Sequence, residues 1–80
     1  EVRVGLATGQ VLSRMGDVFG TTVNLASRLT AMAKPGGTLV DAETRAQLAE
    51  DPRFNLRGQR GRPVRGFGVL RCFVLSRAAD

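Results

Sequence analysis

Apolar residues alternate with polar or small ones over residues 2–7, and a period of two is typical of a strand with one buried face. The alternation breaks at residues 8–9. Residues 10–14 then resume an extended pattern that runs into the glycine-containing segment 15–17. The pattern predicts a hairpin with a short arm over residues 2–19.

The period changes to that of a helix after Gly20. Either Thr21 or Thr22 could accept a hydrogen bond from a backbone N–H as the N-cap of this helix, and residues 35–37, Pro-Gly-Gly, end it. Apolar side chains recur within it at helical spacing and predict a stripe that packs on a sheet. These side chains are Leu25, Ala26, Leu29, Met32 and Ala33.

A short strand and a weaker helix follow. Residues 38–40 are apolar and β-branched, which predicts a strand, and Asp41 can cap a helix over residues 42–50. The apolar side of that helix consists only of Ala46, Leu48 and Ala49. Alternation over residues 54–57 predicts a further strand.

The last third of the chain is basic and rich in glycine. Residues 58–63 are predicted to form a surface loop, and the glycines on both sides of Phe67 within residues 64–69 indicate a bulge or a close backbone approach. Residues 70–75 are predicted to be the last strand, and residues 76–80 a frayed tail. The order of elements predicts an α+β fold with mixed sheet pairing.

Length and composition narrow the class of protein. Eighty residues make one small domain or a piece of a larger one. No apolar run approaches the roughly 20 residues needed to cross a bilayer, so we expect no membrane contact from this segment. Cys72 is the only cysteine, which leaves no partner for a disulfide and favours a reducing, cytoplasmic location, although the full protein could be membrane-attached.

The net charge of +5 comes from eleven arginines and one lysine. Arginine presents planar, forked donors that suit phosphate oxygens, so anionic partners are expected. The chain has no Tyr or Trp and only four Phe, so a base-stacking surface would be poorly supplied. We therefore do not predict nucleic-acid binding, and a small basic nucleic-acid binder stays an alternative.

Three residues around the start of the first helix suggest chemistry. Asp17 precedes the helix, and Asn24 and Arg28 lie four residues apart, on one helix face. An acid, an amide and a fixed cation beside a helix N-terminus suit a nucleotide site. Each also has a plain structural interpretation: Asp17 as a turn residue, Asn24 as a local cap and Arg28 as a solvated side chain.

Together with its intervening residues, the stretch GDVFGTTVNLASR at residues 16–28 resembles the signature of class III nucleotide cyclases, the adenylate and guanylate cyclase catalytic domain. Residues 2–9, 34–40 and 64–68 also resemble segments of that family. The resemblance covers nearly the whole chain. It implies that residues 1–80 are the C-terminal portion of a single ferredoxin-like cyclase domain, in which helices pack on a mixed sheet.

The resemblance also implies roles for four residues. Asp17 would bind the adenine amino group of ATP and disfavour GTP, and Asn24 would orient the ribose. Arg28 would stabilise charge on the phosphates while the 3′ oxygen attacks the α-phosphorus, so Asn24 and Arg28 are the predicted catalytic pair. Arg65 falls where the family often has a lysine that contacts the terminal phosphates, and arginine there keeps the charge but changes the donor geometry.

Other parts of the family site do not match this chain. The two aspartates that hold two Mg²⁺ or Mn²⁺ ions are expected upstream, because neither Asp41 nor Asp51 lies in the required sequence context. The purine-reading lysine is also expected there, because the only lysine here is Lys34, at a helix end. No metal ligand is therefore predicted in this chain.

Family sites lie across a head-to-tail dimer, so a second cyclase protomer is the expected partner. The short hairpin arm resembles that of a bacterial adenylate cyclase subgroup. The implied activity is conversion of ATP to 3′,5′-cyclic AMP and pyrophosphate by the complete dimeric domain, with the 80-residue chain inactive alone. A guanylate cyclase and a non-catalytic cyclase-like module that binds nucleotide or regulates a partner stay open as alternatives.

Overall fold

The computed structural model describes residues 1–14 and 17–78. For residues 12–14 and 17–19 it describes the backbone and not the side chains. Within the described residues, two helices and eight short strands follow one another in the order β1, β2, β3, α1, β4, α2, β5, β6, β7, β8. Their bounds are β1 Val4–Leu6, β2 Leu12–Arg14, β3 Asp17–Phe19, α1 Thr21–Met32, β4 Thr38–Asp41, α2 Ala42–Leu48, β5 Phe54–Gly58, β6 Arg62–Val64, β7 Gly68–Leu70 and β8 Cys72–Arg77. The predicted α+β class is confirmed.

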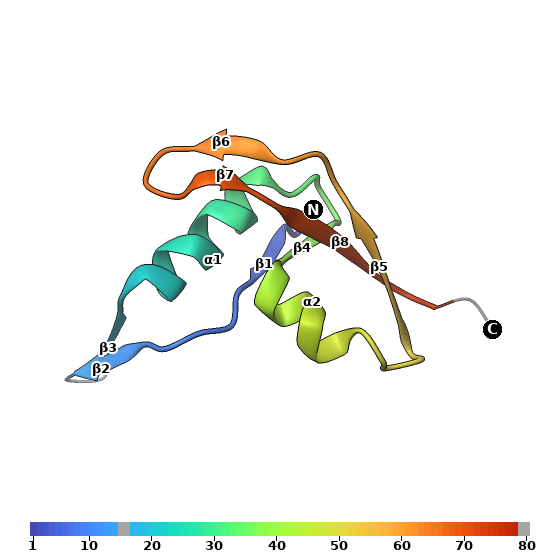
Figure 1. The fold of residues 1–80 in the computed structure, drawn as a ribbon, viewed down its shortest axis with the longest axis horizontal. Coiled ribbons are helices and arrows are strands. Elements are labelled where there is room, and N and C mark those ends of the chain that lie inside the picture. Colours follow the sequence, from blue (N-terminus) through green and yellow to red (C-terminus); the bar gives the residue numbers. More distant parts are fainter. Residues whose placement is uncertain (15–16, 79–80) are drawn as a thin grey trace.

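Four strands form the central sheet in the order β1-β4-β8-β5, and β2-β3 and β6-β7 form two separate hairpins (Figure 1). Strand β1 runs parallel to β4, whereas β8 pairs antiparallel with both β4 and β5. The central sheet is therefore mixed, as expected. In Figure 1 the two hairpins extend away from it, β2-β3 beside the start of α1 and β6-β7 above the helix.

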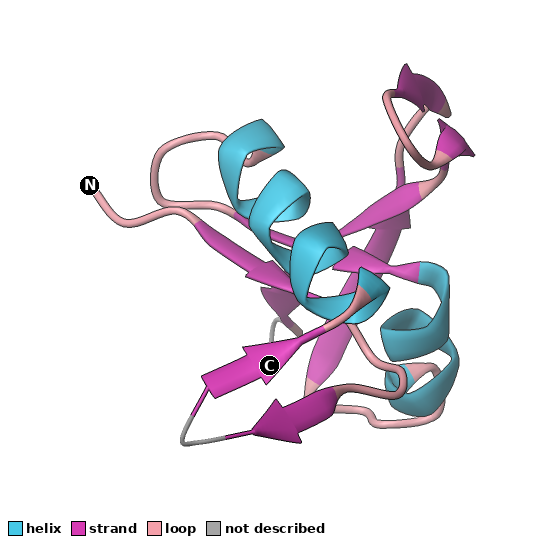
Figure 2. Ribbon diagram, turned by 90° about the vertical axis from the view of Figure 1, so that its left-hand side faces the viewer, coloured by secondary structure: helices cyan, strands magenta, loops and turns pink. Residues whose placement is uncertain are grey.

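Helix α1 lies across one face of the central sheet (Figure 2). Leu29 is fully buried and Ala33 nearly so, and both pack with Leu39 of β4 and Cys72 of β8 in the core. Leu25 and Met32 pack against this cluster from the side. The apolar stripe predicted from helical spacing is thus confirmed as the buried face of α1.

Gly5 allows α1 to approach β1 closely. A β-carbon at this position would lie 2.6 Å from the carbonyl oxygen of Ala26 and would also collide with the backbone of Thr30. Backbone atoms of a helix cannot move aside as a flexible side chain can. The absence of a side chain at Gly5 therefore fixes how near the helix lies to the strand.

Helix α2 begins at the cap that the sequence predicts. The carboxylate of Asp41 accepts a hydrogen bond of 2.9 Å from the backbone N–H of Thr44. Arg45 lies over the ring of Phe73, 5.4 Å from its centroid, and places the helix beside β8. The helix ends at Leu48 instead of residue 50.

The predicted apolar side of α2 is largely wrong. Ala46 and Ala49 are exposed and Leu48 is half-buried, whereas the polar Thr44 is buried. Thr44 tolerates burial because its hydroxyl lies 2.7 Å from that of Thr8, which supplies a hydrogen-bond partner.

The predicted threonine N-cap of α1 is also wrong. The cap position is Gly20, which has φ 123° and gives no side-chain hydrogen bond, and both threonines lie within the helix. The hydroxyl of Thr22 donates instead to the carbonyl oxygen of Gln10, at 2.9 Å. This hydrogen bond therefore connects the segment before β2 to the first turn of α1.

The hairpin prediction over residues 2–19 is correct only for its second half. Strands β2 and β3 pair antiparallel, with Arg14 opposite Asp17. Strand β1 instead joins the central sheet, where Gly5 pairs with Leu39. Of the turn predicted at residues 15–17, Asp17 belongs to β3, and residues 15–16 lie outside the described residues.

Three predictions for the last third need correction. The predicted loop at residues 58–63 contains the end of β5 and the start of β6. The segment around Phe67, for which a bulge or a close backbone approach was predicted, is the turn of the β6-β7 hairpin. Arg71 separates β7 from β8, so the strand predicted over residues 70–75 is two strands.

The predicted frayed tail is wrong for its first two residues. Ser76 and Arg77 belong to β8, where they pair with Asn55 and Phe54 of β5. Residues 79–80 lie outside the described chain. Within the described part, neither helix is long and apolar enough to cross a membrane.

Candidate active site

The outer face of α1 carries the polar residues of the signature. Thr21, Asn24 and Arg28 follow one another at spacings of three and four, so they lie along one side of the helix, and Ser27 lies beside them. All four are exposed, because the opposite face of the helix is buried in the core. Core packing of α1 thereby points this face outward.

The turn of the β6-β7 hairpin forms a second wall. The backbone N–H of Phe67 donates to the carbonyl oxygen of Val64, at 2.9 Å, and closes a four-residue turn. Gly66, the third residue of the turn, has φ 88°, a positive value that glycine adopts without steric cost. This geometry presents Arg65 and Phe67 to α1.

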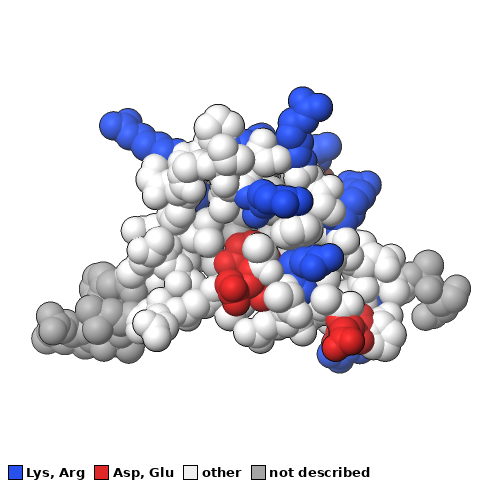
Figure 3. Space-filling model, viewed as in Figure 1, with Lys and Arg blue, Asp and Glu red and all other residues white. Residues whose placement is uncertain are grey.

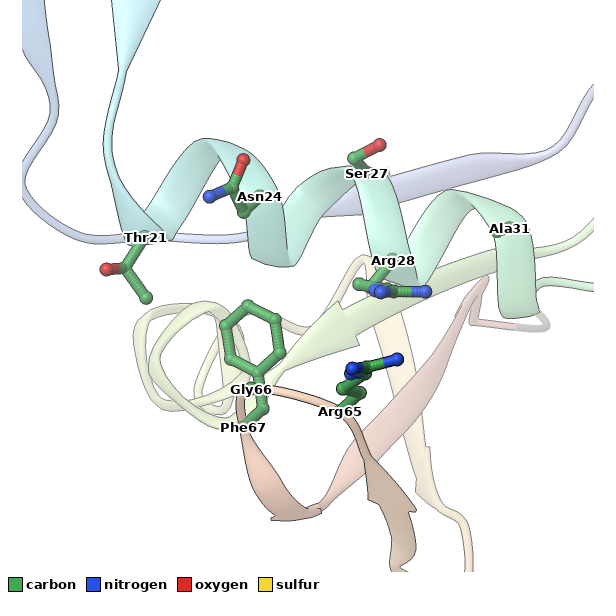
Figure 4. A pocket seen from close by; sticks show the side chains of 8 residues that line it. All are labelled: Thr21, Asn24, Ser27, Arg28, Ala31, Arg65, Gly66 and Phe67. Atoms are coloured by element: carbon green, nitrogen blue, oxygen red, sulfur yellow. The ribbon is translucent and has the colours of Figure 1, made fainter.

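A hollow of about 510 Å³ lies between these two walls (Figure 4). The structure brings Asn24, Arg28 and Arg65 together in its lining, although Arg65 is 37 residues beyond Arg28 in the sequence (65 minus 28). Asp17 is the fourth predicted site residue. Its backbone lies in β3, three residues before Gly20 begins the helix cap, and its side chain lies outside the described part.

The lining also contains residues that the sequence did not indicate, among them Thr21, Ser27 and Phe67. Figure 4 shows the Phe67 ring rising from the turn toward α1, between Thr21 and Arg65. The ring is half-buried and offers an apolar wall, whereas the two hydroxyls offer hydrogen bonds. The flanking glycines of Phe67 were the available signal, because they indicate a tight turn that presents the residue between them.

The hollow is positively charged. Arg28 reaches into it from the helix and Arg65 from the turn, and Figure 4 shows their guanidinium groups extending in the same direction. None of its lining residues is acidic, and the ion pair found among the described side chains, Arg53 with Asp51, lies elsewhere. Two guanidinium groups side by side can form charge-assisted hydrogen bonds with phosphate or carboxylate oxygens.

The described residues do not fit a divalent metal site. No group of three or more His, Cys, Asp or Glu side chains lies together among them. Asp41 is buried as the cap of α2, and Asp51 is engaged with Arg53. The expectation that Mg²⁺ or Mn²⁺ ligands come from upstream residues therefore stays a prediction.

Cys72 lies in the core and takes no part in this site. Burial raises the pKa of its thiol, and the charge of Arg62 offsets a smaller part of that shift. A raised pKa keeps the thiol protonated and unreactive near neutral pH.

Comparison with known proteins gives the family. Residues 1–77 match the family described as the adenylate and guanylate cyclase catalytic domain. An adenylate cyclase of Glutamicibacter nicotianae is 46% identical over 76 residues, which cover 95% of this chain and 19% of the relative. An adenylate cyclase of Streptomyces coelicolor is 42% identical over 103 aligned residues, covering 96% of this chain and 27% of the relative. The chain thus spans about a fifth to a quarter of the length of these relatives.

A solved structure supports the fold. The adenylate/guanylate cyclase/hydrolase of Silicibacter pomeroyi superposes with a TM-score of 0.80 at 24% identity, over 94% of this chain and 45% of that protein. The family match, the identity to bacterial adenylate cyclases and the shared fold agree. This chain belongs to the family of adenylate and guanylate cyclase catalytic domains.

Proposed function

We propose that this chain supplies the nucleotide-binding and charge-stabilising part of an adenylate cyclase site. In the complete dimeric domain, the 3′ oxygen of ATP attacks the α-phosphorus, a cyclic phosphodiester forms and pyrophosphate leaves. The observation that carries the proposal is the convergence of Asn24, Arg28 and Arg65 on one hollow.

The two arginines suit the phosphates of the substrate. Arg28 and Arg65 enter the hollow from opposite walls, so a polyphosphate chain between them can be held from both sides. Negative charge shifts toward the bridging and terminal oxygens as pyrophosphate leaves. A donor that is held in place and aimed at this charge lowers the activation barrier without having to reorganise, and Arg28, on the packed helix α1, is the proposed donor of this kind.

Asn24 suits the ribose. It lies four residues before Arg28, which is about 6 Å along the helix axis, a spacing that lets one residue bind the sugar while the other reaches the phosphates. An amide both donates and accepts hydrogen bonds, so it can orient a ribose hydroxyl or ring oxygen. The proposed contribution of Asn24 is thus placement of the attacking oxygen.

Asp17 is the proposed base-recognition residue. It lies in β3, the strand that leads into α1. It is therefore close to the N-terminal end of this helix, and Asn24 lies near the same end. An acceptor at this position would bind the N6 amino group of adenine and repel O6 of guanine. The relatives in Glutamicibacter nicotianae and Streptomyces coelicolor are adenylate cyclases, which supports ATP over GTP.

A second protomer is the proposed partner. The part of the chain that the structure describes holds no cluster of metal-binding side chains, so the ions that this chemistry uses would be held by other residues. We propose that these residues face the hollow across a head-to-tail dimer, and that the 80-residue chain is inactive alone.

The proposal is tested by assaying cyclic nucleotide production by the complete protein with ATP and with GTP. We expect cyclic AMP with a clear preference for ATP, and an Asp17→Asn variant that loses much of this preference. Equal use of both nucleotides by the unsubstituted protein would favour a guanylate or mixed cyclase. The isolated chain with Mn²⁺ and ATP should form no cyclic AMP, and robust turnover would refute the composite site.

A non-catalytic cyclase-like module is the second candidate. It would hold if the complete protein lacked the two metal-binding aspartates, which are expected upstream of these residues. Under this alternative the complete protein would bind ATP, and Arg28→Ala would weaken that binding, yet no cyclic nucleotide would form. Equilibrium binding and turnover measured on the same preparation separate the two candidates.

A further inference from the structure

A second basic hollow lies at the far end of α1 from the signature. Its volume is about 200 Å³, and it is surrounded by Lys34, Arg57, Gln59 and Arg62, with Leu39 and Val74 among the apolar residues that line it. We call it the Lys34 pocket. It contains none of the predicted site residues and no other residue that lines the candidate active site.

Its position follows from the register of the central sheet. Leu39 pairs with Val74, and Val74 pairs with Arg57, so these three residues form a row across β4, β8 and β5 on one face. Leu39 is buried, Val74 is half-buried and Arg57 is exposed, so the row passes from the core to the surface. Regular strand pairing therefore holds the cation of Arg57 at the edge of an apolar floor.

The other polar groups come from three different elements. Lys34 follows the last turn of α1, and Arg62 begins β6. Gln59 lies just after β5 and is held at two points. Its backbone N–H donates to the carbonyl oxygen of Cys72, at 3.0 Å, and its side-chain oxygen accepts from the Cys72 thiol, at 3.8 Å. Because the side-chain oxygen of Gln59 is occupied, its amide NH₂ group is the part that can donate a hydrogen bond to a ligand in the pocket.

Three cations surround this small volume without a carboxylate in the lining. Exposed lysine and arginine stems often cover apolar surface while their charged ends stay in water. Here the stems leave a hollow, and like charges that converge on it repel one another. A multivalent anion would relieve this repulsion. It could also accept hydrogen bonds from the three cations and from the Gln59 amide.

A third hollow connects the Lys34 pocket to the candidate active site. It shares Arg28 and Arg65 with the site, and Met32 and Arg62 with the Lys34 pocket. A basic groove thus runs between α1 and the β6-β7 hairpin. In Figure 3 most of the lysine and arginine side chains of the visible face lie in its upper half, the half in which Figure 1 has β6 and β7, and the acidic side chains lie lower down.

We propose that the Lys34 pocket binds a small multivalent phosphate anion, with inorganic pyrophosphate as the best-matched example. The volume is below the roughly 300–1,000 Å³ typical of sites for drug-sized ligands, so it suits an anion smaller than a nucleotide. The proposal does not depend on cyclase activity. If the proposed function holds, pyrophosphate is the product of the reaction, and the groove joins the place where it forms to this second subsite.

Lys34 makes the test simple because it is the only lysine in the chain. Its rate of modification by an amine-reactive reagent is measured by mass spectrometry with and without pyrophosphate, at constant ionic strength. N-acetyl-lysine amide in the same tube corrects for effects on the reagent. At a pyrophosphate concentration tenfold above its Kd, we expect modification of Lys34 to slow by about tenfold by mass action.

Matched variants locate the anion. Arg57→Gln and Arg62→Gln should each abolish most of the protection, whereas Arg77→Gln, at an exposed position in β8 outside the pocket, should preserve it. Arg28→Ala should also preserve it, because Arg28 lines the candidate active site and not the Lys34 pocket.

Three results would overturn the proposal. They are the absence of protection in the unsubstituted chain, an equal loss of protection in Arg77→Gln, and protection that disappears in Arg28→Ala. The last result would show that the anion binds in the candidate active site. Equal protection by sulfate at the same ionic strength would indicate general screening of charge and would also refute a phosphate subsite. None of these outcomes bears on whether the complete protein forms cyclic AMP.

Discussion

The two walls of the candidate active site are held by different kinds of structure. Helix α1 is seated on the central sheet through the fully buried Leu29 and through direct backbone contact at Gly5. The β6-β7 hairpin is a two-stranded sheet of its own, and Val69 in it is 70% exposed. Core packing therefore places Asn24 and Arg28, whereas a single turn places Arg65.

This difference suggests a division of function. Isolated two-stranded hairpins are marginally stable, so the position of Arg65 is easier to shift than that of Arg28. Catalysis needs donors fixed where charge develops, and substrate binding tolerates a group that adjusts. We call the face of α1 with Asn24 and Arg28 the helix wall, and the β6-β7 turn with Arg65 the hairpin wall. We therefore expect the helix wall to govern turnover and the hairpin wall to govern affinity.

The largest expected effect is that of Arg28→Ala in the complete protein. Loss of a fixed donor to the transition state should lower kcat by about 100- to 1,000-fold, while KM for ATP changes much less. Steady-state kinetics with ATP measure both constants, and Arg77→Ala in β8 serves as the control, with kinetics expected to be unchanged. A loss of binding as large as the loss of turnover would assign Arg28 to ground-state binding and would remove the contrast with Arg65.

The next largest effect tests how the helix wall is held. Gly5→Ala introduces a β-carbon 2.6 Å from the carbonyl oxygen of Ala26, so α1 must move away from β1. Overpacking of this kind costs about 1–3 kcal/mol of unfolding free energy, which chemical denaturation measures. Gly58→Ala is the matched control, because its β-carbon would meet the Phe73 ring at an ordinary 3.4 Å. Equal losses in both variants would mean that the contact at Gly5 does not position the helix.

A smaller effect tests the hairpin wall. Gly66 has φ 88° and a β-carbon there would meet no atom within 4 Å, so Gly66→Ala strains only the backbone, by about 1–2 kcal/mol. We expect the strain to displace the turn and to raise KM for ATP in the complete protein. Gly66→Asn should behave more like the parent protein, because asparagine tolerates positive φ. A fall in kcat with unchanged KM would contradict the assignment of this wall to affinity.

The same contrast explains which parts of the fold could be predicted. The stripe of α1 is a local pattern with a helical period, so Leu29 and Ala33 were identified as core from the sequence. The pairing of Gly5 with Leu39 joins residues 34 positions apart (39 minus 5), and no local sequence pattern indicates it. The N-cap prediction failed because the Thr22 hydroxyl bonds to Gln10, a partner that tertiary structure provides.

The candidate site divides in the same way. The spacing of Asn24 and Arg28 on one helix indicates a shared face directly. Arg65 could be predicted only through the resemblance to cyclases, because its distance from α1 depends on how the last three strands fold. The glycines on both sides of Phe67 predict a bulge or a close backbone approach, whereas the structure has a hairpin turn there, because such glycines fit any of the three.

The smallest expected effect concerns a charged pair outside both walls. Hydrogen bonds from the side chain and the backbone N–H of Arg53 hold the pKa of Asp51 at about 2, below its ordinary value of 3.8, with the side-chain bonds as the larger cause. A lowered pKa in the folded protein means that the pair stabilises above about pH 4 and that this contribution is lost as the pH falls toward 2. Arg53→Gln should return the pKa of Asp51 toward 3.8, as followed by NMR titration of its carboxyl carbon.

At neutral pH, Arg53→Gln should hardly change the free energy of unfolding, because the side chain of Arg53 is 74% exposed and exposed ion pairs contribute little. A destabilisation as large as that of Gly5→Ala would show that surface charge, and not the seating of α1 on β1, decides the stability of this fold. Core packing would then not be the main factor that positions α1. The contrast between a helix placed by packing and a hairpin placed by a single turn would become weaker.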